Sequence, residues 1–161
     1  MSTINPHQLT DNVKLLQKVA LWKGDEVLII KKSADSVSRP ERWDLPGGNS
    51  EWPDASQAGF GQYAQDIARE VLEETNIQIS NSKFLISKLI FFNTFFDPDK
   101  NVFSILVGWS INLPKNFDKK QIKLSHEHTD FKFVKLEDLD KYDYGYKKGK
   151  FITDIIRASH G

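Results

Sequence analysis

The chain has 161 residues, of which 39% are hydrophobic and 27% are charged, as in one ordinary globular domain. Basic and acidic residues both number 22, so the charge balance disfavours a general binder of nucleic-acid polymers or membrane surfaces. The absence of cysteine excludes disulfides, thiolate metal sites and a cysteine nucleophile.

No segment is long and apolar enough to predict a membrane span. The most apolar stretch, residues 84–96, contains Lys88 and Asn93. Residues 1–9 lack a long apolar run behind a basic region, so no secretory signal is expected. These features predict a soluble, cytoplasmic domain.

The first half of the chain predicts two strands and a sharp turn. Residues 13–21 and 27–30 have strand composition, and residues 23–25 between them are typical of a short turn. A polar, charged loop is expected over residues 31–43. Pro46, Gly47 and Gly48 then predict a sharp turn, because glycine adopts conformations that are closed to other residues.

A helix is expected from residue 57 or later to Thr75, and Asn76 suits its end because asparagine tolerates the left-handed conformation. The sequence then returns to strand character at residues 84–92, 102–111 and 131–134. The aromatic cluster at 91–96 is interpreted as buried strand. Short and C-terminal helices are expected at 136–139 and 149–158. This order predicts a mixed α/β layered domain.

Three carboxylates lie on one side of the predicted central helix. Glu70 and Glu74 are about 40° apart on the helix, and Glu73 is about 60° to the other side of Glu70. Arg69 can reach Glu73 one turn later. The opposite side is expected to bury an apolar stripe consisting of Ile67, Ala68, Val71 and Leu72.

This acidic side has two interpretations. It is either a solvated helix face or a metal site. Glu70 and Glu74 form a like-charged pair, and Glu73 and Glu74 lie at the helix end where the dipole disfavours negative charge. A divalent cation would relieve all three charges, and oxygen ligands suit Mg²⁺ or Mn²⁺.

The Pro-Gly-Gly turn upstream favours a site at the helix. Its backbone carbonyls can serve a metal and its N–H groups can serve a phosphate, although a plain structural turn is the alternative. Two further residues, His126 and His128, could indicate a zinc site, but they lack a matched third ligand.

Together these segments resemble the Nudix hydrolase family. The family signature joins a glycine, a glutamate and the run Arg-Glu-apolar-x-Glu-Glu-x-Gly-apolar, with five and seven intervening residues. Here Gly48 is followed by Asp54, and the later run extends from Arg69 to Ile77. Residues 43–48 also resemble the strand and turn that enter the signature.

Three departures from the signature are evident. Asp54 stands where the family has glutamate. Fourteen residues separate Asp54 from Arg69 where the signature has seven, so seven are inserted, within residues 55–63, where Gly59 and Gly61 suggest a longer loop. Asn76 replaces the glycine that ends the helix. The insertion puts any role for Asp54 in doubt.

The resemblance implies a single Nudix domain over residues 1–161, with an α/β/α sandwich fold and a mixed β-sheet. It implies Mg²⁺, or alternatively Mn²⁺, as cofactor. Arg69 would orient the acids through an ion pair, and Glu127 is the candidate for an additional carboxylate from a later loop. The expected metal ligands are Gly48, Glu70, Glu73, Glu74 and Glu127.

The implied reaction is attack by metal-activated water on a phosphoanhydride, with Glu70 or Glu127 as the base. The substrate would be a small nucleotide-type molecule, such as a nucleoside triphosphate or a nucleotide sugar. Its phosphates could contact Lys32, Arg39, Arg42 or Gly47. Trp43 or Phe92 could stack on a base, although core packing is the alternative for both aromatic residues.

Two other functions compete with hydrolysis. Isopentenyl-diphosphate isomerase shares the fold, but it depends on a cysteine that this chain lacks. The other alternative is a catalytically impaired Nudix-like domain that binds nucleotides as a sensor. The intact Arg69 to Glu74 run favours an active hydrolase, whereas the altered spacing at Asp54 favours the sensor. A homodimer is a further possibility.

Overall fold

The computed structural model describes residues 12–159 of the chain. The expectation about a secretory signal concerns residues 1–9, which lie outside this range. The described helices and strands are, in chain order, β1 (Val13–Lys23), β2 (Glu26–Lys32), β3 (Trp43–Asp44), β4 (Gly47–Asn49), α1 (Gln62–Thr75), α2 (Asn81–Ile86), β5 (Phe91–Asp97), β6 (Val102–Asn112), β7 (His128–Lys135) and α3 (Lys150–Ser159). Short 3₁₀ turns occur at Ala55–Gln57, Lys119–Gln121 and Leu136–Lys141.

The described strands form one seven-stranded mixed sheet. Its main path runs β3-β2-β1-β6-β5, while β4 pairs with β1 and β7 pairs with β2. β1 and β6 are parallel, from Val13 opposite Phe103 to Trp22 opposite Asn112, and the other pairs are antiparallel.

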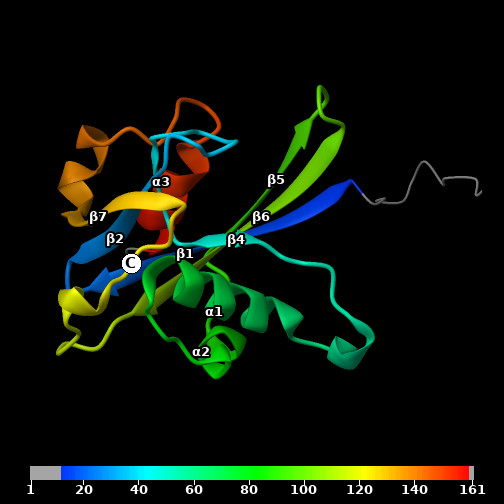
Figure 1. Ribbon diagram of the computed structural model, residues 1–161, viewed down its shortest axis with the longest axis horizontal. Coiled ribbons are helices and arrows are strands. Elements are labelled where there is room, and N and C mark those ends of the chain that lie inside the picture. The colour runs from blue at the N-terminus through cyan, green and yellow to red at the C-terminus, as the bar shows by residue number, and fades with distance from the viewer. Residues whose placement is uncertain (1–11, 160–161) are drawn as a thin grey trace, which may run out of the picture.

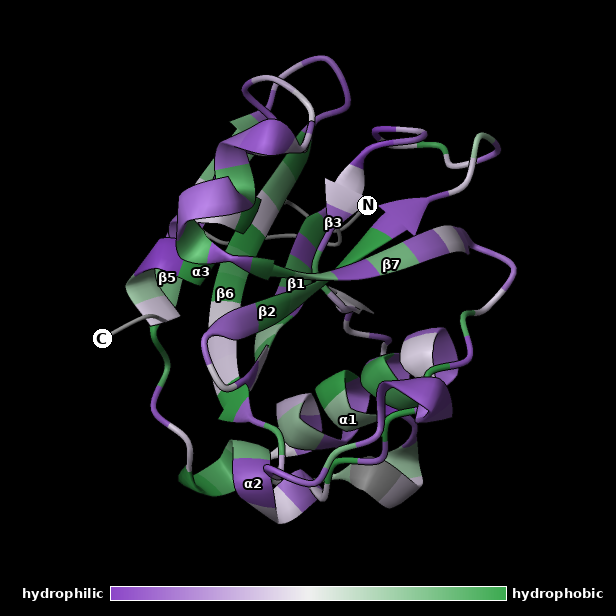
Figure 2. Cartoon of the chain, turned by 90° about the vertical axis from the view of Figure 1, so that its left-hand side faces the viewer, coloured by the Kyte–Doolittle hydropathy of each residue, from purple (hydrophilic) through white to green (hydrophobic). Residues whose placement is uncertain are grey.

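Helices cover both sides of this sheet. Figure 1 shows α1 and α2 on one side and α3 on the other, and Figure 2 shows the same layers after a quarter turn. One core joins the sheet to α1 through Ala64, Ile67 and Val71. The second core joins it to α3 through Ile152 and Ile155. The predicted α/β/α sandwich with a mixed sheet is therefore confirmed.

Most of the predicted elements are present with small shifts at their ends. β1 and β2 extend beyond the predicted strands, and α1 begins at Gln62 and ends at Thr75 as expected. The element after β7 is a 3₁₀ turn. In the part of the chain that the structure describes, no helix combines the length and hydropathy needed to cross a bilayer.

The prediction of a strand over residues 84–92 is wrong for its first part. Phe84 lies in α2, and β5 begins only at Phe91. The side chain of Ser80 accepts a hydrogen bond from the backbone N–H of Ser82, which caps the start of this helix. Phe84 is fully buried and meets Trp109 edge to face. The local cap and the tertiary contact outweigh the strand-like composition.

The aromatic cluster at 91–96 does form a strand, but its expected burial is wrong. Phe92, Phe95 and Phe96 are exposed. β5 is an edge strand, and Figure 1 shows the β5–β6 hairpin reaching beyond the helices that cover the rest of the sheet. No described layer packs on these side chains.

A buried ion cluster fastens β3 to the centre of the sheet. Asp44 is almost completely buried and lies 3.1 Å from the ammonium of Lys18 and 3.0 Å from the guanidinium of Arg39. Burial alone would raise the pKa of Asp44, but the two cations outweigh it and hold the pKa below its usual value. Arg39 also donates to the carbonyl of Tyr144.

Replacement of Asp44 by alanine should lower the free energy of unfolding by about 3–5 kcal/mol, because it leaves buried cations without their partner. Asp140→Ala is the control, since Asp140 forms an exposed pair with Arg157, and it should cost at most about 1 kcal/mol. Urea denaturation measures both variants. Equal losses in the two would contradict a structural role for the buried cluster.

Candidate metal centre

Helix α1 carries the acidic residues to the sheet. Ile67, Ala68 and Val71 are buried as predicted, and Asn76 ends the helix in the left-handed conformation with φ of 62°. Leu72 departs from the expected apolar stripe because it is 44% exposed. The helix is thus rotated so that Glu74, rather than Leu72, faces inward.

The carboxylate of Glu74 is buried against the start of β4, where the chain leaves a bend at Pro46, and this segment is called the Gly47–Gly48 bend. The predicted sharp turn is shorter than expected, because Gly47 and Gly48 already lie in β4 and pair with Lys18 and Gln17 of β1. Glu74 is 6% exposed, and its Oε2 accepts a hydrogen bond of 2.9 Å from the backbone N–H of Gly47. Burial raises the pKa of Glu74 to about 8, although Lys18 and the Gly47 hydrogen bond oppose this shift. A buried carboxylate with so unfavourable an environment is typical of a functional site.

Glu70 and Glu73, the other two helix carboxylates of the predicted site, lie around Arg69. Its Nη1 is 3.1 Å from Glu70 Oε1 and 3.3 Å from Glu73 Oε2. The side chain of Glu73 is 57% exposed, whereas that of Glu70 is mostly buried. Burial raises the pKa of Glu70, and the positive charge of Arg69 opposes the shift. The three acids therefore point in different directions, with Glu74 inward and Glu73 outward.

Gly48 brings the bend into contact with Glu70. A Cβ atom at position 48 would lie 2.8 Å from Glu70 Oε2, closer than a methyl group can approach. Gly47 has φ of 136°, and a Cβ atom there would lie 2.1 Å from the carbonyl oxygen of Gln17. Gly47 is therefore needed for the close approach of β4 to β1, because a side chain there would meet backbone atoms, whereas a side chain at position 48 would meet the flexible end of Glu70.

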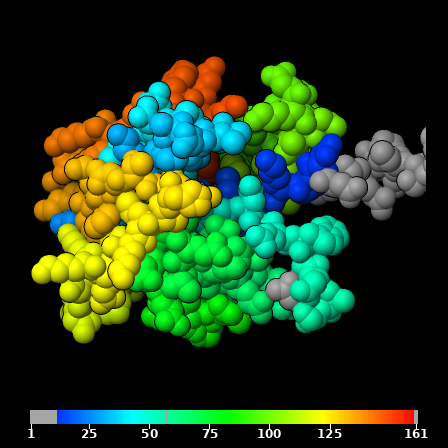
Figure 3. Space-filling view, viewed as in Figure 1, coloured from blue at the N-terminus to red at the C-terminus, as the bar shows by residue number. Residues whose placement is uncertain are grey.

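A second carboxylate and an imidazole reach Glu74 from the start of β7. Ligand atoms of Glu74, Glu127 and His128 all lie within 4.8 Å of one another. Backbone hydrogen bonds hold the segment that carries Glu127 and His128 to α1 and to the loop after β2. The N–H of Ser125 donates to the carbonyl of Glu74, and the N–H of Ser33 donates to the carbonyl of Glu127. In Figure 3, the light-blue segment around residue 35, the yellow segment around residue 127 and the green helix α1 lie on the same face.

His128 is the group member that sequence reasoning did not connect with Glu74. It is 9% exposed, and its Nδ1 is buried with no hydrogen-bond partner among the described residues. Burial, followed by the positive charge of Lys18, lowers the pKa of His128 to about 4, so the ring is neutral near pH 7. The His126–His128 pair was the only sequence signal for it, and His126 itself is exposed.

These groups fit a divalent cation. The donor set comprises two carboxylates and a neutral imidazole, which are ordinary ligands of divalent metals. The buried Nδ1 of His128 lacks a partner that a cation could supply. The close packing of Glu70 on Gly48 adds a further carboxylate beside the bend.

The remaining predicted residues differ in their surroundings. Lys32 is half-buried and lies opposite His128 in the β2–β7 pair. Burial lowers its pKa, although Asp44 opposes the shift. Arg42 forms an ion pair of 3.3 Å with Asp143. Trp43 is buried against Tyr142, in agreement with the core-packing interpretation, and Phe92 is exposed on β5.

Asp54 lies in the inserted segment, which is an exposed loop with one 3₁₀ turn. Its Oδ1 accepts hydrogen bonds from the backbone N–H and the hydroxyl of Ser56. The residue at this position of the signature therefore caps a local turn. Gly59 and Gly61 both have positive φ, in agreement with the predicted longer loop.

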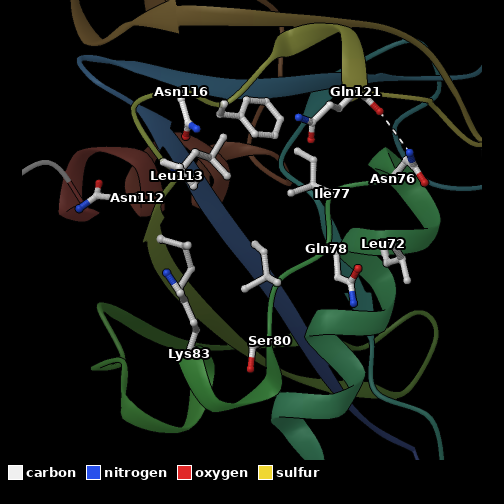
Figure 4. Close-up of a pocket in the computed structure, with 14 residues that line it drawn as sticks. Leu72, Asn76, Ile77, Gln78, Ser80, Lys83, Asn112, Leu113, Asn116 and Gln121 are labelled. Carbon is white, nitrogen blue, oxygen red and sulfur yellow. Dashed lines mark hydrogen bonds between the residues drawn. The ribbon is translucent and has the colours of Figure 1, made fainter.

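A pocket of about 540 Å³ lies at the C-terminal end of α1, away from the acidic cluster. Leu72, Ile77, Lys83 and Leu113 contribute to its lining. Figure 4 shows the hydrogen bond from the side chain of Asn76 to the backbone of Gln121 at its rim. None of the predicted site residues lines this pocket.

The sequence matches the family model of the NUDIX domain over residues 18–155. The chain therefore belongs to the NUDIX family of hydrolases. A comparison with curated proteins gave no match.

Solved structures with this fold include two MutT proteins. The MutT NUDIX hydrolase from Burkholderia pseudomallei is 14% identical with a TM-score of 0.65, and 91% of this chain and 99% of that chain are covered. The MutT protein from Methanosarcina mazei Go1 is 22% identical with a TM-score of 0.62, with coverage of 92% and 95%.

The NUDIX domain of Shewanella oneidensis NrtR, solved in complex with ADP ribose, is also similar. It is 14% identical with a TM-score of 0.61, and 96% of this chain and 92% of that chain are covered. At these identities, the similarity to all three structures concerns the fold.

The metal-free protein should lose about 2 kcal/mol of unfolding free energy as the pH rises from about 6.5 to about 8. Folded Glu74 retains its proton up to about pH 8, whereas the unfolded carboxyl, with a pKa of 4.5, has lost it. Below pH 6.5, His128 acts oppositely, because its lowered pKa makes stability rise with pH between about 4 and 6.5.

Urea denaturation in the presence of EDTA measures this dependence. The variant Glu74→Gln, which cannot ionise, should remove the decrease between pH 6.5 and 8. The same decrease in the variant would assign the effect to another group.

Proposed function

We propose that the chain is a Mg²⁺-dependent pyrophosphohydrolase, with Mn²⁺ as an alternative ion. It cleaves a phosphoanhydride bond in a nucleoside diphosphate that is linked to another group. The observation that carries this proposal is the buried carboxylate of Glu74, held against the Gly47 amide and close to Glu127. Membership of the NUDIX family supports the same reaction class.

The cation would be held by Glu74 and Glu127, with Glu70 and the carbonyl of Gly48 as additional ligands. When bound, such an ion neutralises phosphate charge and lowers the pKa of an attacking water. Glu73 is largely exposed, so its contribution would be indirect, through the ion pair with Arg69. Arg69 also contacts Glu70 and would orient that carboxylate.

The bond changes are those of a simple hydrolysis. The water oxygen forms a bond to one phosphorus atom, the bridging P–O bond breaks, and the bridging oxygen leaves with the second phosphate. The proton of the water passes to a carboxylate. Glu70 and Glu127 are the two candidates for this base. Glu70 lies beside Gly48, and Glu127 lies near the Glu74 carboxylate.

Lys32 is the cation best situated to contact the substrate phosphates. It lies opposite His128 across the β2–β7 pair, and Glu74 contributes to its electrostatic surroundings. Arg42 is further restrained by Asp143. A nucleotide-type substrate agrees with the ADP ribose bound by the similar NrtR domain. Nucleoside triphosphates and nucleotide sugars belong to the same chemical class.

The second candidate function is a nucleotide-binding domain with impaired catalysis. Asp54 is the specific observation in its favour, since its carboxylate caps a local turn in an exposed loop. Such a domain would bind nucleoside diphosphate compounds without converting them. A turnover assay therefore separates the two candidates.

The full chain should hydrolyse at least one member of a panel of nucleoside triphosphates, nucleotide sugars and dinucleotides when Mg²⁺ or Mn²⁺ is present. Replacement of Glu74 by glutamine should reduce turnover by about 100-fold or more, because charge stabilisation at the cation is the main catalytic contribution. Chromatographic separation of the nucleotide products measures the rate.

Glu137→Gln provides a matched control, since Glu137 is an exposed residue of the 3₁₀ turn that follows β7. It should retain wild-type turnover. Equal rates for the wild type and Glu74→Gln would reject the proposal. Nucleotide binding without turnover in the wild type would favour the second candidate.

A further inference from the structure

We propose that His128 supplies a nitrogen ligand to the cation, so that the centre binds Mn²⁺ in preference to Mg²⁺. This inference rests on the proposed function, because it concerns the same cation site. It adds a ligand of a different chemical type to the carboxylates. An imidazole nitrogen favours a transition-metal ion such as Mn²⁺ over Mg²⁺, whereas a set of oxygen ligands suits both ions.

The first support is the geometry of the three side chains. Two ligands of one ion, each about 2.0–2.2 Å from it, lie at most about 4.4 Å apart. Ligand atoms of Glu74, Glu127 and His128 are already within 4.8 Å of one another. The three groups are therefore close enough for one ion to draw them together through side-chain movement.

The second support is the unsatisfied ring of His128. The residue is 9% exposed, and its buried Nδ1 has no partner among the described residues. A buried polar atom without a partner costs free energy, and native structures rarely retain one without a reason. A cation held by this nitrogen would supply the missing partner.

The charges around the ring permit the ligation. The ammonium of Lys18 donates to Asp44 and to the carbonyls of Leu45 and Gly47, so its hydrogen bonds go to the β3–β4 segment. Lys32 is the other nearby cation. Two carboxylates, Glu74 and Glu127, face the neutral ring. A divalent ion would thus balance two negative charges and coordinate one neutral nitrogen.

The chain itself contains a control. His126 lies two residues before His128 and on the same loop, but it is exposed and outside the group formed with Glu74. If His128 merely lay near the site, its substitution would affect metal binding no more than substitution of His126. The two substitutions His126→Gln and His128→Gln therefore separate ligation from proximity.

Electron spin-echo spectroscopy of Mn²⁺ bound to the full chain tests the proposal directly. The wild type should show a histidine nitrogen coupling that changes when its histidines carry the heavier nitrogen isotope. The coupling should persist in His126→Gln and disappear in His128→Gln. If His128→Gln fails to fold, the wild type and His126→Gln together decide the question, because a coupling that persists without His126 excludes that histidine as the ligand.

Calorimetric titration supplies a second measurement. His128→Gln should weaken Mn²⁺ binding about 10-fold or more and should change Mg²⁺ binding much less. Mn²⁺ bound without nitrogen coupling would overturn this inference and leave the proposed function intact. Failure of hydrolysis in the nucleotide screen, with the coupling present, would instead overturn the proposed function alone. Absence of any Mn²⁺ binding would overturn this inference.

Discussion

The ammonium group of Lys18 holds the turn between β3 and β4 against the centre of the sheet. It contacts Asp44 at 3.1 Å, the Leu45 carbonyl at 3.2 Å and the Gly47 carbonyl at 3.3 Å. Because these contacts fix the bend, the Gly47 N–H points at Glu74. The position of the acidic helix relative to the bend therefore depends on one buried lysine in β1.

Burial of the Glu74 carboxylate destabilises its charged form in the metal-free protein. Its pKa of about 8 means that a proton and a divalent cation compete for the carboxylate near neutral pH. Near the Glu74 carboxylate, His128 is neutral and adds no charge, and the negative charge of Glu70 is paired with Arg69. Stability is thus sacrificed locally for a group that can receive a cation, a common feature of functional sites.

The sequence predicted those parts of the site whose signals are local. The period of α1 and the left-handed Asn76 follow from neighbouring residues. The predicted Pro-Gly-Gly turn is correct only at Pro46, because Gly47 and Gly48 lie in β4 and pair with β1. The exposure of Leu72 and the inward direction of Glu74 depend on how the helix is rotated against the sheet, which periodicity does not determine. His128 reaches Glu74 only because β7 pairs with β2, a long-range contact. α2 was missed because the apolar run Phe84, Leu85 and Ile86 has a strand-like composition.

The parallel pairing of β1 with β6 has a consequence for how the molecule is made. Positions 13 and 103 are direct neighbours in the sheet, although most of the chain lies between them. The chain loses the entropy of closing this long loop before the β1–β6 contacts stabilise it, so folding is slow relative to that of helical bundles. During synthesis on the ribosome, β1 emerges before β6 and lacks this parallel partner until β6 has left the exit tunnel.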